Sequence, residues 1–90
     1  MPRLTDDQAR ERAAALDSWE FRGKDIRKQY RFGGFKEAMA FVNRVAALAE
    51  EVDHHPDFLV EYDRVTLTLT SHDSGGLTER DFRLARKIDG

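Results

Sequence analysis

The sequence predicts an α+β domain of two layers, in which helices cover one face of a four-stranded antiparallel sheet. Two pairs of short segments alternate apolar with polar residues, and a short turn joins each pair, which is the pattern of a β-hairpin. Three other segments carry apolar residues at steps of three and four, which is typical of helices packed on a core. The resulting order is α-ββ-α-ββ-α. Hairpins separated by a long helix favour a single sheet with its helices on one side.

The first helix is predicted over residues 6–16. Thr5 and Gln8 fit a capping box at its start, and Ala9 and Ala13 lie on one face of it.

The first hairpin follows, with a strand around Trp19, a turn at residues 23–25 and a second strand over residues 26–32. The second strand carries Arg27, Lys28 and Arg31, which we expect on a solvated face or edge of the sheet.

The longest helix is predicted to begin at Phe35, where the apolar spacing changes to steps of three and four. It must end by His55, because Pro56 disfavours helical backbone for the residue before it. The apolar stripe expected to lie on the sheet comprises Phe35, Met39, Val42, Val45, Ala46, Ala49 and Val52, and Phe41 and Leu48 widen it.

The second hairpin is predicted over residues 58–70, with its turn at residues 63–64. Tyr62 shares its strand face with Phe58 and Val60, so we expect it to pack in the core.

A loop over residues 71–76 leads to the last helix, which Thr78 caps. Leu77 and Phe82 are placed as a hydrophobic staple, and Asp81 is placed to complete a capping box.

Size and composition limit the function classes. The chain has 90 residues, too few for two cores, so residues 1–90 are expected to form a single domain. Its formal charge is −2, without the basic excess of proteins that bind nucleic acid or membrane surfaces. The absence of cysteine excludes disulfides, thiolate metal ligands and a cysteine nucleophile. With a polar start and no apolar run near the roughly 18 residues of a membrane span, we expect a soluble, cytoplasmic protein.

All three histidines lie at two predicted junctions. His54 and His55 precede the third strand, and His72 follows the fourth. Because these strands are hairpin partners, the start of one lies beside the end of the other, and His72 should approach the pair. Histidine is also common at helix ends, where its proton suits the helix dipole. The convergence of three imidazoles favours a functional site over that structural reading.

The residues around the histidines follow a recognisable spacing, formed by Glu50, His54-His55-Pro56, Tyr62, His72 and Asp81. Further residues of the same pattern are Trp19, Phe32, Phe35, Arg44-Val45-Ala46, Ser71-His72-Asp73, Gly76-Leu77 and Arg80-Asp81. In these residues the chain resembles the pterin-4a-carbinolamine dehydratase family, over residues 4–89.

The resemblance implies an activity and a setting. Members of the family are hydro-lyases that dehydrate 4a-hydroxytetrahydropterin, the product of aromatic amino-acid hydroxylases, to quinonoid dihydropterin. They use no metal and no other cofactor, and their sheet carries its helices on one side. The chain is then expected to act as a 4a-hydroxytetrahydrobiopterin dehydratase in pterin recycling, functionally linked to a hydroxylase. The family's habit and the exposed sheet edges also imply a homo-oligomer, either a dimer or a tetramer.

Carried over position by position, the resemblance makes His54, His55 and His72 the active-site histidines. The positions implied to bind or shape the pterin pocket are Glu50, Asp53, Pro56, Phe58, Ser71, Asp73, Ser74 and Asp81. Phe58 departs from the family, where a tryptophan often stands, so the indole N–H is lost there.

Several of these residues also have structural readings. Asp81 completes the capping box whether or not it serves the site. Asp53 would serve simply to end the long helix. Glu50 is unfavourable near a helix C-terminus, which indicates a partner or a site role.

Imidazole suits the implied reaction. A carbinolamine carries a hydroxyl and a nitrogen on one carbon, and hydroxide leaves only when it is protonated. A base must also take the N5 proton as the C=N bond forms. Imidazole supplies both forms near neutrality. We assign proton transfer to His54 and His72, and we assign His55 to holding the pterin and its leaving hydroxyl.

Two other classes remain open. One is a non-catalytic interaction module, because a vertebrate member of the family also serves as a dimerisation cofactor for a homeodomain transcription factor, and a fold does not fix a function. The intact set of three histidines favours catalysis over this class. The other is a small protein with a three-histidine metal site. Consecutive histidines disfavour it, since their side chains diverge.

Overall fold

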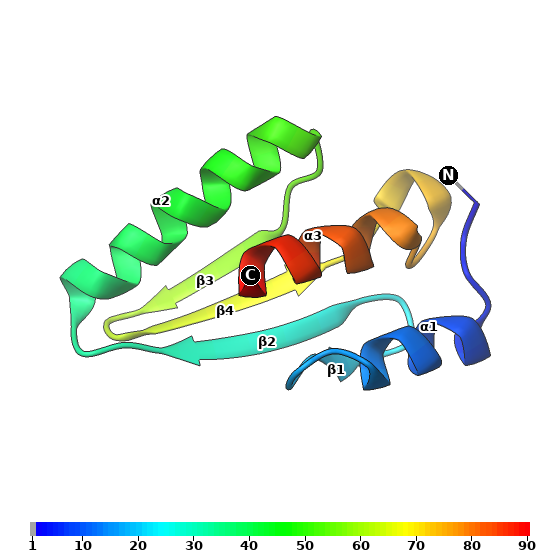
Figure 1. Cartoon of the computed structure of the whole chain (residues 1–90), viewed down its shortest axis with the longest axis horizontal. Helices are drawn as coiled ribbons and strands as arrows, with labels where there is room; N and C mark the ends of the chain where they lie inside the picture. Colours follow the sequence, from blue (N-terminus) through cyan, green and yellow to red (C-terminus); the bar gives the residue numbers. More distant parts are fainter. Residues whose placement is uncertain (1) are drawn as a thin grey trace.

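The computed structural model describes residues 2–90 and confirms the predicted fold class (Figure 1). Its elements are α1 (Asp6–Ala14), β1 (Glu20–Phe21), β2 (Ile26–Arg31), α2 (Phe35–Val52), β3 (Asp57–Glu61), β4 (Arg64–Leu69), the short 3₁₀ helix η1 (His72–Ser74) and α3 (Glu79–Asp89). All neighbouring strands are antiparallel, in the order β1-β2-β4-β3. β2 and β4 are therefore the inner strands, while β1 and β3 form the two edges.

The strand register separates the sheet into a covered and an open face. Ile26 pairs with Leu69, and both are fully buried beneath the helices. Three residues along, Gln29 pairs with Thr66 on the opposite face, where the Gln29 amide donates to the Thr66 hydroxyl at 3.3 Å. Cross-strand partners share a face, so the whole sheet follows this division.

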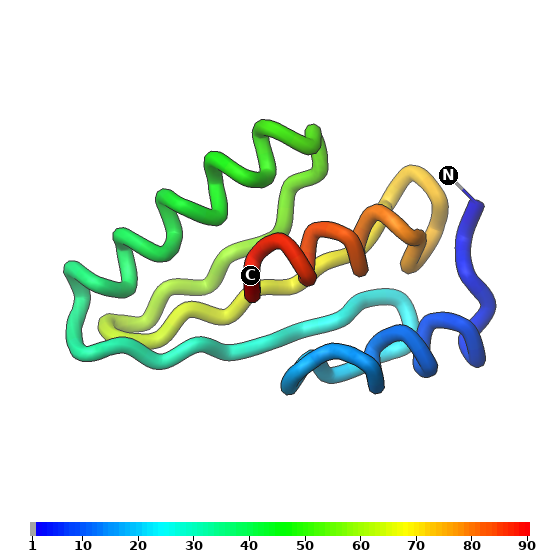
Figure 2. The backbone as a smooth tube through the Cα atoms, viewed as in Figure 1, coloured from blue at the N-terminus to red at the C-terminus, as the bar shows by residue number. Residues whose placement is uncertain are grey.

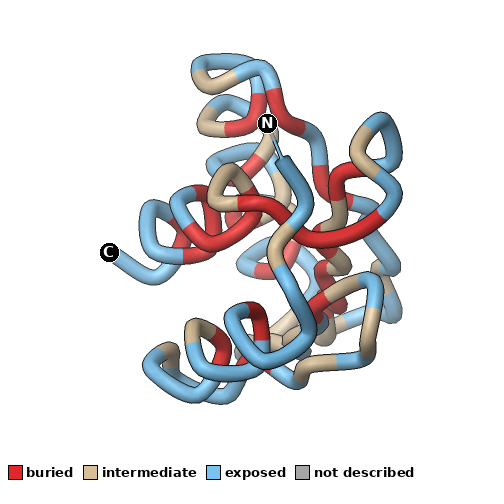
Figure 3. Tube along the Cα trace, turned by 90° about the vertical axis from the view of Figure 1, so that its right-hand side faces the viewer, coloured by how far each residue is buried: buried red, intermediate tan, exposed pale blue. Residues whose placement is uncertain are grey.

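One apolar cluster joins all three helices to the covered face. Its buried members include Ala9 and Ala13 of α1, Val45 of α2, and Phe82 of α3. The buried segments face one another across the interior of the molecule (Figure 3). The helices thus cover a single face of the sheet, and the short alanines let α1 approach it closely.

The face that α2 turns toward the sheet differs from the predicted stripe. The buried residues of α2 are Ala38, Phe41, Val45 and Ala49. Phe35, the first residue of the predicted stripe, is 51 % exposed. The Phe41 ring packs on the rings of Tyr30 and Phe32, with centroids 4.5 and 5.0 Å apart. The contact of Phe41 with these two rings determines which side of the wide apolar stripe faces the sheet. The periodicity of apolar residues alone does not determine that side.

Two expectations near the second hairpin were wrong. Tyr62 is 69 % exposed instead of packing in the core. β3 ends at Glu61, and Tyr62 with Asp63 forms the turn, one residue earlier than predicted. Tyr62 adopts a positive φ of 54°, which takes it out of the alternation of the strand.

Smaller differences occur at the ends of the first two elements. α1 ends at Ala14, and two tight turns through Ala15 and Leu16 replace its predicted last residues. β1 contains only two residues. Trp19 lies just before it and is buried.

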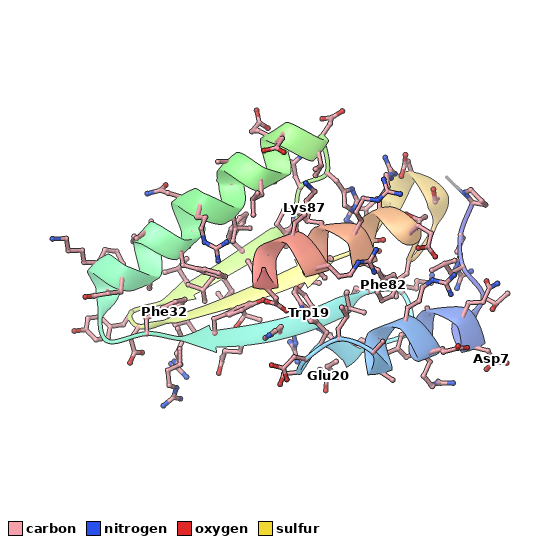
Figure 4. The ribbon with its side chains drawn as sticks, in the orientation of Figure 1. Asp7, Trp19, Glu20, Phe32, Phe82 and Lys87 are labelled. Carbon is pink, nitrogen blue, oxygen red and sulfur yellow. The ribbon has the colours of Figure 1, made fainter. Side chains whose placement is uncertain are left out.

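Lys28 was expected in solvent, but its side chain is only 13 % exposed. Its ammonium group lies 3.1 Å from the carboxylate of Asp89, at the end of α3. The same carboxylate accepts hydrogen bonds from Trp19 Nε1 at 2.8 Å and from the Tyr30 hydroxyl at 2.5 Å. Figure 4 shows Trp19 below the C-terminal turn of α3. Burial, followed by the bond to Asp89, raises the pKa of Tyr30 above its ordinary value.

Candidate active site

The turn after α2 positions the first two histidines. Asp53 adopts a left-handed conformation with φ 53°, and the backbone N–H of His54 donates to Ala49 O at 3.0 Å. This bond satisfies one of the last carbonyls of the helix. His54, His55 and the buried Pro56 then lead directly into β3. Asp53 therefore ends the helix, which is the structural role expected from the sequence.

His54 is the buried histidine of the site, with 8 % of its surface exposed. Its Nε2 atom lies 2.5 Å from Oδ1 of Asp81, whose side chain is fully buried. With Asp81 ionised, Nε2 carries the proton and donates it to the carboxylate, which leaves Nδ1 as the acceptor. The contact fixes the orientation of the ring.

Asp81 also organises the start of α3. Its Oδ2 atom accepts the backbone N–H of Thr78 and the hydroxyl of Ser71, each at 2.9 Å. The first of these bonds belongs to the predicted capping box. Since Ser71 follows β4 and His54 follows α2, one carboxylate connects three segments of the chain. The capping role of Asp81 is therefore confirmed, and its other oxygen contacts the ring of His54.

His55 lies on the surface beside Glu50. Its Nε2 atom is in contact with a carboxylate oxygen of Glu50, and both side chains are more than half exposed. Glu50 was expected to have a partner or a site role because it lies near the C-terminus of a helix, and its partner is His55.

His72 comes from the segment after β4. Ser71 and Gly76 form an isolated bridge that closes this segment, and Gly75 turns it with a positive φ of 76°. His72 begins η1 and is exposed. Figure 2 shows η1 and the α2–β3 connection at the same end of the molecule, away from the β3–β4 turn.

The three histidines line one open depression of about 380 Å³. The residues around it are Asp53, His54, His55, Thr70, Ser71, His72, Asp73 and Arg80. The strand-pairing argument placed His72 beside the other two, and the structure brings all three together.

Five predicted site residues do not line this depression among residues 2–90: Glu50, Pro56, Phe58, Ser74 and Asp81. Glu50 and Asp81 lie one contact away, behind His55 and His54. Phe58 is on the edge strand β3, 37 % exposed, and forms no wall of the depression.

Two lining residues were not predicted as site residues. Thr70 follows β4 directly, and Arg80 lies in the first turn of α3. One Nη atom of Arg80 donates to both carboxylate oxygens of Asp73, at 3.0 and 3.3 Å. The capping box of Thr78 and Asp81 could have indicated Arg80, because it places the first turn of α3 beside the segment that carries His72.

Metal binding has no support in the arrangement of the side chains. Within residues 2–90, no group of three histidine or carboxylate side chains is placed to hold one ion. The Nε2 atoms of His54 and His55 instead contact two different carboxylates.

Fold and site define a class: a small α+β protein with a depression lined by three histidines at one end of its sheet. The family model described as pterin 4 alpha carbinolamine dehydratase matches residues 2–90. The chain belongs to this family.

Relatives with similar sequences align over nearly the whole chain. A protein of Thermomicrobium roseum, provisionally named a pterin-4-alpha-carbinolamine dehydratase, is 51 % identical over 88 residues, covering 98 % of this chain and 95 % of the relative. A similarly named protein of Sulfurisphaera tokodaii is 42 % identical over 89 residues, covering 99 % and 96 %.

Solved structures show the same fold. A transcriptional coactivator/pterin dehydratase from Brucella melitensis has a TM-score of 0.91 and 37 % identity, covering 97 % of this chain and 95 % of that chain. A pterin dehydratase-like protein identified as a RuBisCO assembly factor in the alpha-carboxysome has a TM-score of 0.70 and 30 % identity, covering 81 % of this chain and 87 % of that chain.

None of the helices in residues 2–90 has both the length and the apolar character needed to cross a membrane.

Proposed function

We propose that this protein dehydrates a pterin 4a-carbinolamine to the quinonoid dihydropterin and water, as a 4a-hydroxytetrahydrobiopterin dehydratase. One observation carries the proposal: three imidazoles line one depression, and a buried carboxylate orients one of them. Membership of the dehydratase family supports the substrate class.

His54 is proposed as the base. Its Nε2 is committed to Asp81, so Nδ1 is the nitrogen that takes a proton. A base oriented by a carboxylate is a recurring arrangement in acid–base catalysis. In this reaction the base removes the N5 proton while the C4a–N5 double bond forms.

His72 is proposed as the acid. Among residues 2–90, no side chain forms a hydrogen bond with its exposed ring. An imidazolium there can donate to the 4a-hydroxyl, which then leaves as water as the C4a–O bond breaks. The two steps balance, because one proton leaves N5 and one reaches the departing oxygen. Positioned proton transfer contributes about 10²–10⁴-fold to a rate.

His55 is proposed to hold the substrate. Its ring is exposed at the rim and is braced by Glu50, so it can contact a pterin without depending on the core. Asp53 and Asp73 line the same depression and offer carboxylate oxygens to the pterin ring, while the buried hydroxyl of Ser71 holds Asp81.

We further propose that the protein works in the cytoplasm as a homo-oligomer, in pterin recycling beside an aromatic amino-acid hydroxylase. The edge strand β3 carries the exposed apolar residues Phe58 and Leu59, which a neighbouring copy can cover.

A non-catalytic interaction module is the second candidate. It is favoured by the similarity to a structure described as a RuBisCO assembly factor and by the same exposed edge. An assembly role makes no use of the proton-transfer groups, so activity measurements separate the two.

The test follows the decay of freshly prepared 4a-hydroxytetrahydropterin, with the uncatalysed rate subtracted. His54 is buried and bound to Asp81, so its replacement by alanine would leave a space and an unpaired carboxylate oxygen. His54→Gln keeps a donor near the Nε2 position and is the better variant. We expect His54→Gln and His72→Ala each to lower kcat by roughly 10²-fold.

His55→Ala is expected to raise KM with little change in kcat, the pattern of a lost ground-state contact. The decisive variant combines His54→Gln with His72→Ala. If it remains folded by circular dichroism and dehydrates as fast as the parent, these histidines are not the catalyst, and the interaction module becomes the better proposal.

A further inference from the structure

A second cavity lies behind the histidine depression, between the end of α2 and the first half of α3. It measures about 250 Å³ and is lined by Val52, His54, Arg80, Arg83 and Leu84. His54 and Arg80 also line the depression, so these two side chains stand between the two spaces.

The cavity is rich in hydrogen-bond donors that lack acceptors. Arg83 is exposed to solvent, and within residues 2–90 it forms no ion pair and no side-chain hydrogen bond. The Nε atom of Arg80 is buried and also has no acceptor in this part of the chain. A buried donor without a partner is unfavourable, and an anion that accepts from it removes the penalty.

Three carboxylates on α2, η1 and α3 already have partners. Asp73 accepts from Arg80, and Glu51 lies 3.8 Å from the ammonium group of Lys87. Figure 4 places Lys87 on the side of α3 that faces α2. Asp81 accepts from His54, Ser71 and Thr78. Among residues 2–90, no carboxylate lines the cavity, whose charged lining residues are Arg80 and Arg83 and whose apolar walls are Val52 and Leu84.

The chemistry of a pterin connects this cavity to the proposed reaction. C4a, N5 and C6 are consecutive ring atoms, so a substituent on C6 leaves the ring two bonds from the reacting carbon. If His54 takes the N5 proton, that substituent begins beside His54, at the boundary of the second cavity.

We propose that the cavity binds the C6 substituent of the substrate and that the protein prefers pterins whose substituent is anionic, ending in a phosphate or a carboxylate. This inference rests on the proposed function and names the substrate class for the same site. Arg83 supplies the free guanidinium, Arg80 contributes its unpaired Nε, and Val52 with Leu84 contacts the carbon chain.

The test uses two ligands that differ only by one phosphate group, 7,8-dihydroneopterin and its 3′-phosphate. Their Kd values are measured by isothermal titration calorimetry on the full chain, without reference to activity. We expect the phosphate to bind about tenfold more tightly, and Arg83→Gln to reduce this ratio to about twofold.

Arg86→Gln is the matched control. Arg86 is exposed on the same helix and does not line the cavity, so its loss changes the net charge equally and should leave the tenfold ratio in place. Equal Kd values for the two ligands in the parent, or a ratio unaffected by Arg83→Gln, would overturn this inference while the dehydratase proposal stands. If neither pterin binds, this inference fails, and the dehydration rate alone then decides the dehydratase proposal.

Discussion

Nε2 of His54 and Oδ1 of Asp81 lie 2.5 Å apart, and this contact ties the end of α2 to the first turn of α3. The other oxygen of the same carboxylate caps α3 and accepts the hydroxyl of Ser71. A change at Asp81 therefore acts on helix capping and on the orientation of the histidine together, and the two effects can be separated by experiment.

Asp81→Ala should destabilise the protein by about 3 kcal/mol. The change removes a helix cap, worth about 1 kcal/mol, and leaves buried donors unpaired, at about 1–3 kcal/mol. Asp81→Asn keeps an acceptor and should cost less stability while still lowering kcat, because His54 loses its carboxylate. Urea unfolding and the dehydration rate measure the two effects.

The matched control is Thr5→Ala, which breaks the exposed capping box of α1. It should cost about 1 kcal/mol and leave kcat unchanged. If Asp81→Ala costs no more than Thr5→Ala, the buried network around Asp81 contributes nothing beyond the cap.

Protonation of Asp89 should make the protein less stable in acid. Burial acts to raise the pKa of Asp89, but hydrogen bonds from Tyr30, Trp19 and Lys28 outweigh it and lower the pKa below its ordinary value. A lowered pKa in the folded state gives stability that is present above the unfolded value of about 3.9 and is lost as the pH falls through the folded value.

Asp89→Ala should therefore reduce the free energy of unfolding by about 2 kcal/mol at pH 7, and this difference from the parent should shrink in acid. Urea unfolding across the pH range measures it. Glu11→Ala, an exposed change in α1, is the control and should stay within about 0.5 kcal/mol. A difference for Asp89→Ala that does not change with pH would contradict the titration of this carboxylate.

Metal removal should leave the dehydration rate unchanged. The Nε2 atoms of His54 and His55 are bonded to separate carboxylates, so the rings do not converge on one ion. We expect elemental analysis of the purified protein to find no stoichiometric zinc or iron. One tightly held metal per chain, with activity lost after chelation, would refute the proposed roles of the histidines.

Light scattering should report a dimer or a tetramer at micromolar concentration. Leu59, at 55 % exposure on the edge strand β3, offers apolar surface to a neighbouring copy. Leu59→Lys should favour the monomer, because a charge on an edge strand discourages pairing. Glu20→Lys, on the opposite edge strand β1, is the control and should leave the assembly intact. A monomeric parent would refute the proposed homo-oligomer.

Local sequence signals located most of the elements. The change from alternating to helical spacing at Phe35 marks the first residue of α2, and Pro56 limits its end. The capping boxes at Thr5 and Thr78 are both present in the structure. These signals succeed because a cap or a spacing depends only on residues a few positions apart.

Signals that depend on distant partners were missed or misread. Lys28 is charged, so it was expected in solvent, but Asp89 from the far end of the chain pairs with it. Tyr62 continues the alternation of β3, although the turn begins there. In each case a contact or a backbone conformation formed elsewhere decided the position of the side chain.

The sequence by itself determined the order of helices and strands, the family, and the approach of His72 to His54 and His55, because antiparallel pairing brings the end of one strand beside the start of the next. Only the tertiary structure decided which residues orient those histidines and which space lies behind them. Asp81 meets His54, and Arg83 meets the second cavity, only after α3 has packed beside α2. Packing is a property of surfaces far apart in the chain, so no local spacing encodes it.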